Sequence, residues 1–358
     1  MKPRGPLLVA AHLPPPVHGM SLVSEAMTRR LALRFETEVI DTSPGSLTRG
    51  ARYHLRKARA IRRVYARLAA SPTPGAMYLP LDAGWGLAYA RLLAGRASRV
   101  GAPIVVHHHN RSYIAARDRR VEGVLRALES EVHVFLSDGM RADFIRVYGP
   151  VANSQVLGNA GFLEPSEGPP RRPSNVGVIS NLSRMKGLED ALGLLDEPRF
   201  EGRLHVAGPA DDWAEERLAE ASNRWGSRLE VWGPVDGDRK RRFWEAVGTL
   251  VFPSRLAEAQ PLTILEAFAH GIPVVAREGE GVRDLIGECS SWIVPADVEF
   301  ACEAMIKLDT WRSEPAEYAR ARRLASTRFA DLRERGIQEF EALVETLKRC
   351  VSARREPR

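Results

Sequence analysis

Cysteine is scarce in this sequence, with three residues in 358 that are widely spaced and odd in number. Cys289, Cys302 and Cys350 fit neither the paired spacing of a zinc site nor a disulfide framework, which is typical of a reducing compartment. Long apolar runs are missing too, since no stretch reaches the roughly 18 residues of a membrane-spanning helix. The apolar run near the N-terminus is cut off at Pro14–Pro16, short of the length of a signal peptide. We therefore expect a cytoplasmic protein.

Acidic residues are absent between Asp41 and Asp82, in a chain whose net charge is +7. A helix over residues 49–67 is predicted there, with a basic face opposite an apolar face. The basic face comprises Arg52, Arg56, Arg59, Arg63 and Arg67, and the apolar face Leu55, Ala58, Ile61, Tyr65 and Leu68. The basic face is either solvated or docked on the anionic inner surface of a membrane, where each basic residue adds roughly 1 kcal/mol. Nucleic acid is less favoured as a partner, because no recognition motif or aromatic stacking platform accompanies the charge.

Short apolar runs alternate with segments of helical periodicity along the chain, which predicts an α/β fold. A chain of 358 residues is long enough for two domains. The Pro-, Gly- and Ser-rich stretch Glu164–Ser174 is typical of a linker between them. We expect two doubly wound, Rossmann-like domains that face a cleft, over residues 1–165 and 175–335, and a separate C-terminal segment over 336–358 with a basic tail. The G-x-G-x-x-G fingerprint is missing, which argues against a dinucleotide oxidoreductase.

Residues 249–287 carry the clearest functional pattern. The apolar run Thr249–Phe252 predicts a buried strand, and Pro261 stands where a helix begins, because the first turn does not use its missing N–H. The helical periodicity ends at Gly271, and Ile272–Ala276 predicts a second buried strand. The segment is therefore predicted to fold as strand, loop, helix and strand.

Two glutamates lie on either side of the start of this helix, Glu258 in the loop and Glu266 in the second turn. The amides of the first turn lack intrahelical acceptors, so together with the helix dipole they form an anion site. A carboxylate beside a phosphate site is repelled by the phosphate, so we expect these carboxylates to accept hydrogen bonds from hydroxyl groups. A ligand with phosphates at one end and vicinal hydroxyls nearby, such as a nucleotide sugar, has this chemistry.

The stretch E-A-Q-P-L-T-I-L-E-A-F-A-H-G-I-P-V-V-A, which begins at Glu258, resembles the retaining glycosyltransferases of the GT-B fold, group 1 and family 4-type. Their donor site holds two glutamates separated by seven residues, as Glu258 and Glu266 are. The family's paired-glycine loop, which ends in an acidic residue, is matched loosely by Gly279–Asp284, with a glutamate between the glycines and aspartate in place of glutamate. The resemblance extends over nearly the whole chain and is strongest from Val176 to Gly287.

The resemblance implies donor-site residues in the second domain. The family's lysine on the donor diphosphate matches Lys186, but Asn181 occupies the position of its arginine, and Arg184 is the nearby substitute. The amides after the glutamine of the motif would also bind the diphosphate, and a turn further back would bind the base. The implied donor-binding residues are Arg184, Lys186, Glu266, Gln260, Pro261, Leu262, Gly19 and Val235.

The resemblance implies further residues in the first, acceptor-binding domain. A histidine at the end of a strand reaches the donor sugar in this family, and His109 matches it best, with His107 as the alternative. His18, in the P-P-P-x-H-G loop, and Asn110 are candidates for the acceptor side. The implied catalytic residues are thus Glu258, His109 and Lys186, and the last helix is expected to cross back to the first domain.

A metal site is not expected. His107, His108 and His109 are consecutive in an extended segment, so only the first and third share a face, and no carboxylate or cysteine stands at ligand spacing. Asp236-Gly237-Asp238 looks like a D-x-D metal motif, but it begins a helix, where acids cap free amides.

The resemblance implies a metal-independent, retaining glycosyltransferase of the hexosyltransferase type, without a cofactor, acting in polysaccharide biosynthesis. It would move a sugar from a nucleoside-diphosphate sugar to a hydroxyl of a glycan, a lipid-linked acceptor or a small molecule. Two alternatives stay open: a catalytically silent nucleotide-sugar-binding scaffold on the same fold, and a sugar-nucleotide epimerase.

Overall fold

The computed structural model describes residues 5–17, 19–45, 51–128, 132–166, 168 and 172–352. The chain forms two compact units. Unit 1 comprises residues 1–162 and 335–358, and unit 2 comprises residues 163–334. Each unit is built on a six-stranded parallel sheet with helices, so the predicted α/β fold with two Rossmann-like domains is confirmed.

The sheet of unit 1 has the strand order β2-β1-β3-β4-β5-β6. Its strands are β1 (Gly5–Ala11), β2 (Thr37–Asp41), β3 (Pro74–Leu81), β4 (Ile104–His108), β5 (Val132–Phe135) and β6 (Asn153–Val156). β1 pairs with β2 and β3 on its two sides, with Val9 opposite Val39 and Tyr78. Because all the strands are parallel, their carboxyl ends meet at one edge of the sheet, where open α/β sheets bind ligands.

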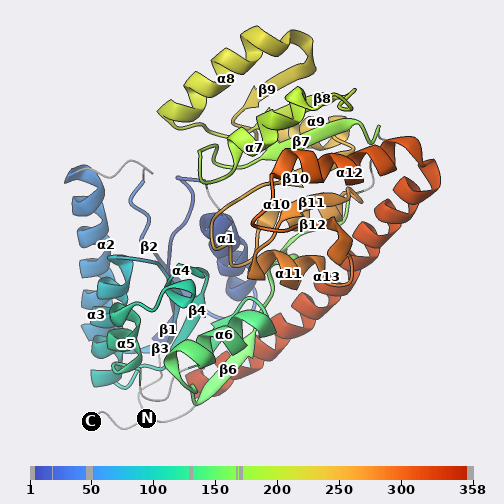
Figure 1. Ribbon diagram of the computed structural model, residues 1–358. Coiled ribbons are helices and arrows are strands. Elements are labelled where there is room, and N and C mark those ends of the chain that lie inside the picture. The colour runs from blue at the N-terminus through green and yellow to red at the C-terminus, as the bar shows by residue number, and fades with distance from the viewer. Residues whose placement is uncertain are drawn as a thin grey trace. The chain divides into compact units, whose positions relative to one another are not determined.

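Six helices of unit 1 follow these strands: α1 (Gly19–Ala32), α2 (Ala51–Ala69), α3 (Gly86–Arg99), α4 (Ser112–Ala115), α5 (Arg119–Leu125) and α6 (Asp138–Tyr148). A 3-10 turn, η1 (Asn159–Phe162), ends this part of the unit. Ser137 caps α6, since its Oγ accepts a hydrogen bond of 3.0 Å from the amide of Met140. α2, α3 and α5 lie together on one side of the sheet (Figure 1).

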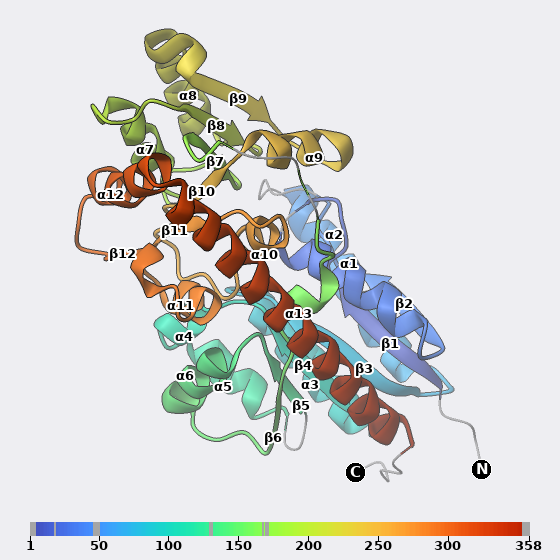
Figure 2. The same ribbon diagram turned by 90° about the vertical axis from the view of Figure 1, so that its right-hand side faces the viewer.

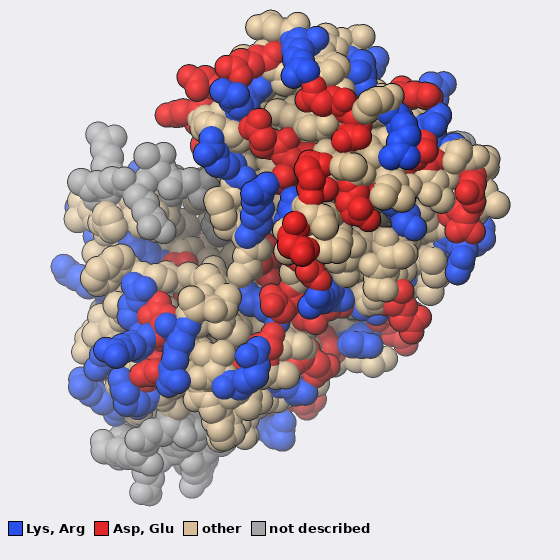
Figure 3. Space-filling view, viewed as in Figure 1, with Lys and Arg blue, Asp and Glu red and all other residues tan. Residues whose placement is uncertain are grey.

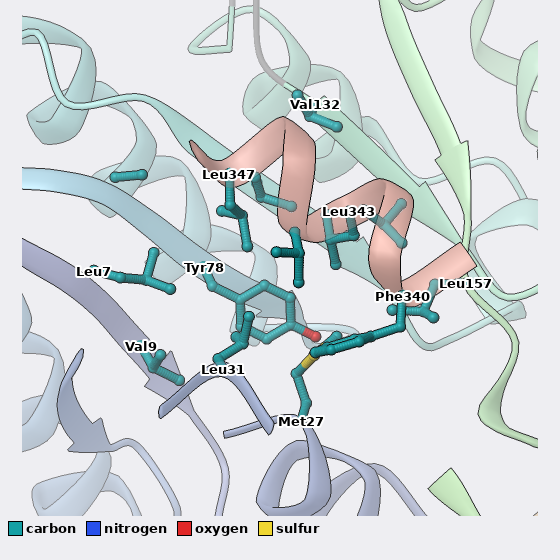
Figure 4. Packing of buried hydrophobic residues seen from close by; sticks show 14 of the residues in the cluster. Leu7, Val9, Met27, Leu31, Tyr78, Val132, Leu157, Phe340, Leu343 and Leu347 are labelled. Carbon is teal, nitrogen blue, oxygen red and sulfur yellow. The ribbon is translucent and has the colours of Figure 1, made fainter. Parts of the chain in front are cut away.

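The other face of this sheet is covered by α1 and by the end of α13 (Pro315–Ser352), a helix that starts in unit 2 and continues through unit 1 from residue 335. Figure 2 shows the later turns of α13 in front of β3 and β4. Met27 and Leu31 of α1 and Leu343 of α13 pack around the buried ring of Tyr78 (Figure 4). Burying such side chains contributes roughly 1.5–3 kcal/mol each, which ties the C-terminal helix to this unit.

The apolar face predicted for α2 is partly wrong. Leu55 is 51% exposed, whereas Lys57 is only 5% exposed. The buried face consists of Lys57, Ala60, Ile61, Val64 and Leu68. A helical projection that sorts residues by hydropathy assigns Lys57 to the polar face. In the structure its amine is buried beneath the helix, where it contacts two polar side chains. On the basic face, Arg67 Nε donates to Glu38 at 2.5 Å, and the side chain of Arg52 lies outside the described residues.

The sheet of unit 2 has the order β12-β11-β10-β7-β8-β9. Its strands are β7 (Asn175–Ile179), β8 (Arg203–Ala207), β9 (Leu229–Gly233), β10 (Thr249–Phe252), β11 (Val274–Arg277) and β12 (Ile293–Val294). Its other helices are α7 (Leu188–Leu192), α8 (Asp212–Trp225), α9 (Gly237–Ala246), α10 (Leu262–Ala269), α11 (Glu280–Ile286) and α12 (Phe300–Ser313). Short 3-10 turns are η2 (Gly193–Asp196), η3 (Gly226–Arg228) and η4 (Ser290–Trp292). The predicted strand, loop, helix and strand over 249–276 is thus confirmed.

Candidate functional site

The candidate site lies at the carboxyl edge of the unit 2 sheet, where the loop after β7 packs on the loop after β10. Gly187 has φ +77°, and a Cβ there would stand 2.3 Å from the carbonyl oxygen of Pro253. The amide of Arg255 donates to the carbonyl of Met185 at 2.9 Å, which fixes the same contact from the other side. Only glycine allows this approach, so Lys186, directly before it, is held against the segment that carries Glu258.

The paired-glycine stretch packs on the same loop. A Cβ at Gly281, in α11, would stand 2.2 Å from the carbonyl oxygen of Glu258 and 2.5 Å from that of Ala259. The second glycine of Gly279-Glu280-Gly281 is therefore required by the close approach of the 258–259 backbone. Close packing thus explains why this loop has a glycine at position 281. The loop that carries Glu258 is contacted by Gly187 on one side and by Gly281 on the other.

Helix α10 begins at this edge. Pro261 is its N-cap residue and has no side-chain acceptor, so the amides of the first turn receive no cap from it. Thr263 Oγ1 donates to the carbonyl of Ile179 at 3.2 Å, which fixes the first turn to the end of β7. The N-terminal end of α10 with Leu262 therefore faces the edge where Lys186 and Glu258 lie, as an anion site requires.

Each of the two motif glutamates is held by a lysine. Lys186 Nζ donates to Glu258 Oε1 at 2.5 Å, and Ser254 Oγ donates to the same oxygen at 2.8 Å. Lys240 Nζ donates to Glu266 Oε1 at 2.6 Å. In both glutamates Oε2 accepts no hydrogen bond from the described part of the chain, so one oxygen of each carboxylate is left for hydroxyl groups.

Neither Lys240 nor Ser254 was predicted from the sequence. Lys240 belongs to a basic run in α9 that reads as a solvated face, and only the fold brings it to Glu266, 26 residues further along the chain. Asp236 begins α9 as predicted, but its side chain makes no capping hydrogen bond within the described residues, so that expected cap is wrong.

Other predicted donor residues lie apart from these pairs. Arg184 is exposed, and its guanidinium stacks on the ring of Trp213 in α8 at 5.0 Å from the ring centroid. Val235, in the loop after β9, and Gln260 are half-buried.

In unit 1, His109 directly follows β4 and is half-buried. Its ring lies 4.0 Å from that of His107, so these two histidines share a side, as their spacing predicted. Burial lowers the pKa of His109 to about 3, so the ring is neutral at physiological pH. Its Nε2 is buried and has no hydrogen-bond partner among the described residues. His109 is thus a neutral imidazole with an unused nitrogen.

The remaining candidates of unit 1 differ in position. Asn110 Oδ1 accepts a hydrogen bond of 2.8 Å from the amide of Ser112, the first residue of α4. Gly19 is the exposed first residue of α1, while His18 lies outside the described residues.

A second polar cluster, which the sequence did not indicate, lies at the carboxyl edge of the unit 1 sheet. Lys57 Nζ contacts His12 Nε2 and donates to Asp82 Oδ2 at 3.3 Å. Burial lowers the pKa of Lys57, and the nearby Asp82 only partly offsets this. Burial raises the pKa of Asp82, but the charges of Lys57 and His12 outweigh it, so the net pKa is lowered and the carboxylate stays ionised.

Within the described part of the chain, one group of three possible metal ligands lies close together, Glu197, Glu299 and Cys302. The last two are exposed, and none belongs to the predicted site, so this group carries no argument for a metal. The three consecutive histidines form no such group there. No described helix combines the length and the apolar character needed to cross a membrane.

Comparison with solved structures shows the class of fold. The Anabaena protein HepE in complex with UDP-glucose matches with a TM-score of 0.71 at 16% identity, over 96% of this chain and 100% of that one. Sucrose-phosphate synthase from Thermosynechococcus elongatus matches with a TM-score of 0.68 at 16% identity, over 96% and 99%. The lipopolysaccharide outer core galactosyltransferase WaaB matches with 0.63 at 16%, over 95% and 99%. The chain has the GT-B fold.

Residues 173–310 match the family Glycosyl transferases group 1. The exopolysaccharide phosphotransferase SCO2592 of Streptomyces coelicolor is 30% identical over 171 residues, which is 47% of this chain. The match covers only 17% of the length of that relative.

Proposed function

We propose that this protein is a retaining glycosyltransferase that moves a hexose from a nucleoside-diphosphate sugar to a hydroxyl acceptor without a metal ion. The observation that carries the proposal is the pair of lysine–glutamate contacts, Lys186 with Glu258 and Lys240 with Glu266, at the end of the sheet where α10 begins. A diphosphate is bound by cations and free helix amides, and the sugar hydroxyls next to it are bound by carboxylates with one unused oxygen.

The roles divide by charge. Lys186, Arg184 and the first amides of α10 bind the diphosphate. Glu266 Oε2 accepts from the ribose hydroxyls, and Glu258 Oε2 accepts from the hydroxyls of the transferred sugar. His109 is proposed to hydrogen-bond the sugar as a neutral donor or acceptor.

Catalysis in this proposal is electrostatic. Negative charge develops on the diphosphate as the bond to the sugar breaks, and Lys186 and the dipole of α10 stabilise that charge. These fixed charges do the work that a metal ion does elsewhere, so turnover should persist in EDTA. Retention means that the acceptor oxygen takes the face from which the diphosphate leaves, and proton NMR of the product's anomeric centre tests this.

UDP-glucose is the first donor to test, because the similar Anabaena structures hold UDP and UDP-glucose. Incubation with a panel of UDP-, GDP- and ADP-sugars and analysis of the nucleotides released separates the rival functions. Glycosyl transfer or donor hydrolysis releases the nucleoside diphosphate. A phosphotransferase acting on the same donor would move the sugar 1-phosphate and release the monophosphate, an epimerase would alter the sugar and release nothing, and a scaffold would leave the donor intact. Release of the monophosphate, or no reaction with any donor, would contradict the proposal.

The acceptor partner is proposed to be a glycan or a lipid-linked sugar at the cytoplasmic face of a membrane. The support is the exposed side of α2, on which Arg56, Arg59, Arg62 and Arg63 face solvent. Each contributes roughly 1 kcal/mol near an anionic surface. Sedimentation with neutral and anionic vesicles measures this contact, and equal binding to both would contradict it.

A further inference from the structure

A groove on unit 1 runs along one face of α3, with α2 and α5 on its flanks. Its volume is about 460 Å³, within the range of about 300–1,000 Å³ that is typical of small-molecule sites. It is built from helices, and its lining includes none of the candidate glycosyltransferase residues. The groove is therefore considered separately from the function proposed above.

The lining of the groove is apolar along α3. Leu87, Ala88 and Leu92 contribute to it, together with the ring of Tyr65 from α2. Leu92 is 50% exposed, which is unusual for a leucine in a helix that packs between two others. An apolar strip of this kind makes favourable contacts with a hydrocarbon chain but none with a small hydrophilic anion.

Arginines stand along the same groove. Arg91 and Arg99 are exposed, and Arg96 lies over the ring of Tyr65 at 5.3 Å from its centroid. None of these three forms an ion pair with a described carboxylate, and Arg96 Nε is buried without a hydrogen-bond partner in the same part of the chain. The fourth arginine of the groove, Arg120, is already neutralised by the carboxylate two residues before it. Three positive charges thus remain for an anionic ligand.

The surroundings extend this positive charge. Lysine and arginine side chains gather over the part of unit 1 where α2, α3 and α5 lie, at the lower left of Figure 3. Their field raises the local concentration of anions and disfavours neutral or cationic ligands. Charge and apolar lining together select a ligand that is anionic at one end and oily at the other.

We propose that this groove binds one anionic phospholipid molecule, with its phosphate among Arg91, Arg96 and Arg99 and an acyl chain along Leu87, Ala88 and Leu92. The planar guanidinium suits bidentate contact with phosphate oxygens. The site is discrete and differs from the diffuse attraction of the α2 arginines to a charged surface. It stands independently of glycosyl transfer.

Gly95 provides a sharp test, because it lies on the lining in the middle of α3. A Cβ at this position would meet no atom within 4 Å. Gly95→Leu therefore fills the groove without removing a charge or straining the helix, and leucine favours the helix more than glycine does. Gly95→Ala has the same effect on the helix but leaves the groove open, so it is the matched control.

The probe is dihexanoylphosphatidylglycerol at a concentration where it stays monomeric, titrated calorimetrically into the full chain. Dihexanoylphosphatidylcholine and glycerol 3-phosphate serve as comparison ligands. We expect the anionic lipid to bind at least tenfold more tightly than either. Gly95→Leu and Arg91→Gln/Arg99→Gln should each weaken it about tenfold or more, while Gly95→Ala and the α2 pair Arg59→Gln/Arg62→Gln stay within about twofold.

Four results would overturn the proposal. These are an undiminished affinity in Gly95→Leu, equal binding of glycerol 3-phosphate, an equal loss in the α2 pair, and no binding of the lipid by the unaltered chain. Melting temperatures of the two Gly95 variants at or above that of the parent exclude misfolding as the cause of a loss. Nucleotide release from the donor, measured on the same variants, reports on the proposed function separately.

Discussion

The two sheets place a lysine–carboxylate pair at the same edge but bury its lysine to different depths. In unit 1 the side chain of Lys57 is 6% exposed and that of Asp82 31%, whereas in unit 2 those of Lys186 and Glu258 are 24% and 19% exposed. Burying a charge is costly, so a buried pair must hold itself together and cannot be spared for a ligand. A pair whose lysine is partly exposed contributes little to stability and can exchange its partner for an incoming phosphate or hydroxyl. We therefore expect the pair of unit 1 to serve the structure, and we propose the pair of unit 2 as part of a ligand site.

Lowering the pH should destabilise unit 1 more than unit 2, and this is the largest difference that we predict between them. In unit 1, burial lowers the pKa of His107 and His108, and it lowers that of His133 to about 4. Among the described residues of unit 2, burial lowers the pKa of His205. Above about pH 6.5 neither state takes up these protons and the stability is fully present. As the pH falls from there towards the native pKa, the unfolded chain binds protons that the native state cannot, so stability is lost.

For His133 alone this loss is about 2 kcal/mol at pH 5, and the other two histidines add to it in the same direction. Hydrogen exchange at pH 7.5 and pH 5, corrected for the intrinsic rate, measures it unit by unit. Peptides from β4 and β5 should lose protection much more than peptides from β10 and β11. An equal loss in both sheets would remove this difference between the units.

Removing the lysine of each pair should cost stability unequally. Lys57→Met leaves the partly exposed Asp82 without its buried partner and should cost about 2 kcal/mol of unfolding free energy. Lys186→Met removes a lysine that is partly exposed and should cost less than about 1 kcal/mol. Methionine keeps the length of the stem, so packing changes little in either variant. Urea unfolding of both variants gives the comparison, and similar losses would show that depth does not distinguish the pairs.

The smallest predicted effect concerns Glu258, the carboxylate of the pair in unit 2. In Lys186→Ala the charge of Glu258 is no longer balanced and repels a bound diphosphate. Adding Glu258→Gln removes that repulsion, so the double variant should bind a nucleoside diphosphate about threefold to tenfold more tightly than Lys186→Ala alone. Calorimetry on the two variants measures the recovery. No recovery would mean that Glu258 does not face the diphosphate.

What the sequence could predict was local. The strand, loop and helix around Pro261 follow from signals within a few residues, and the spacing of Glu258 and Glu266 fixes their places on that frame. Lys57 and Lys240 were missed because their partners lie far along the chain, on other elements. A hydropathy projection has no means to find a lysine that is buried by an aspartate 25 residues away. How deeply the lysine of a pair is buried depends on packing alone. This burial is what distinguishes the pair expected to be structural from the pair proposed to bind a ligand.

The most direct measurement is a calorimetric titration of the unaltered chain and Lys186→Ala with UDP, or with whichever nucleoside diphosphate the donor panel selects. A lost hydrogen bond to a charged group is worth roughly 1.5–3 kcal/mol, which corresponds to a tenfold to hundredfold weaker affinity. We predict a loss of this size, with an unfolding free energy that changes by less than about 1 kcal/mol. Equal affinity in the two proteins would contradict the placement of a diphosphate at this edge of unit 2.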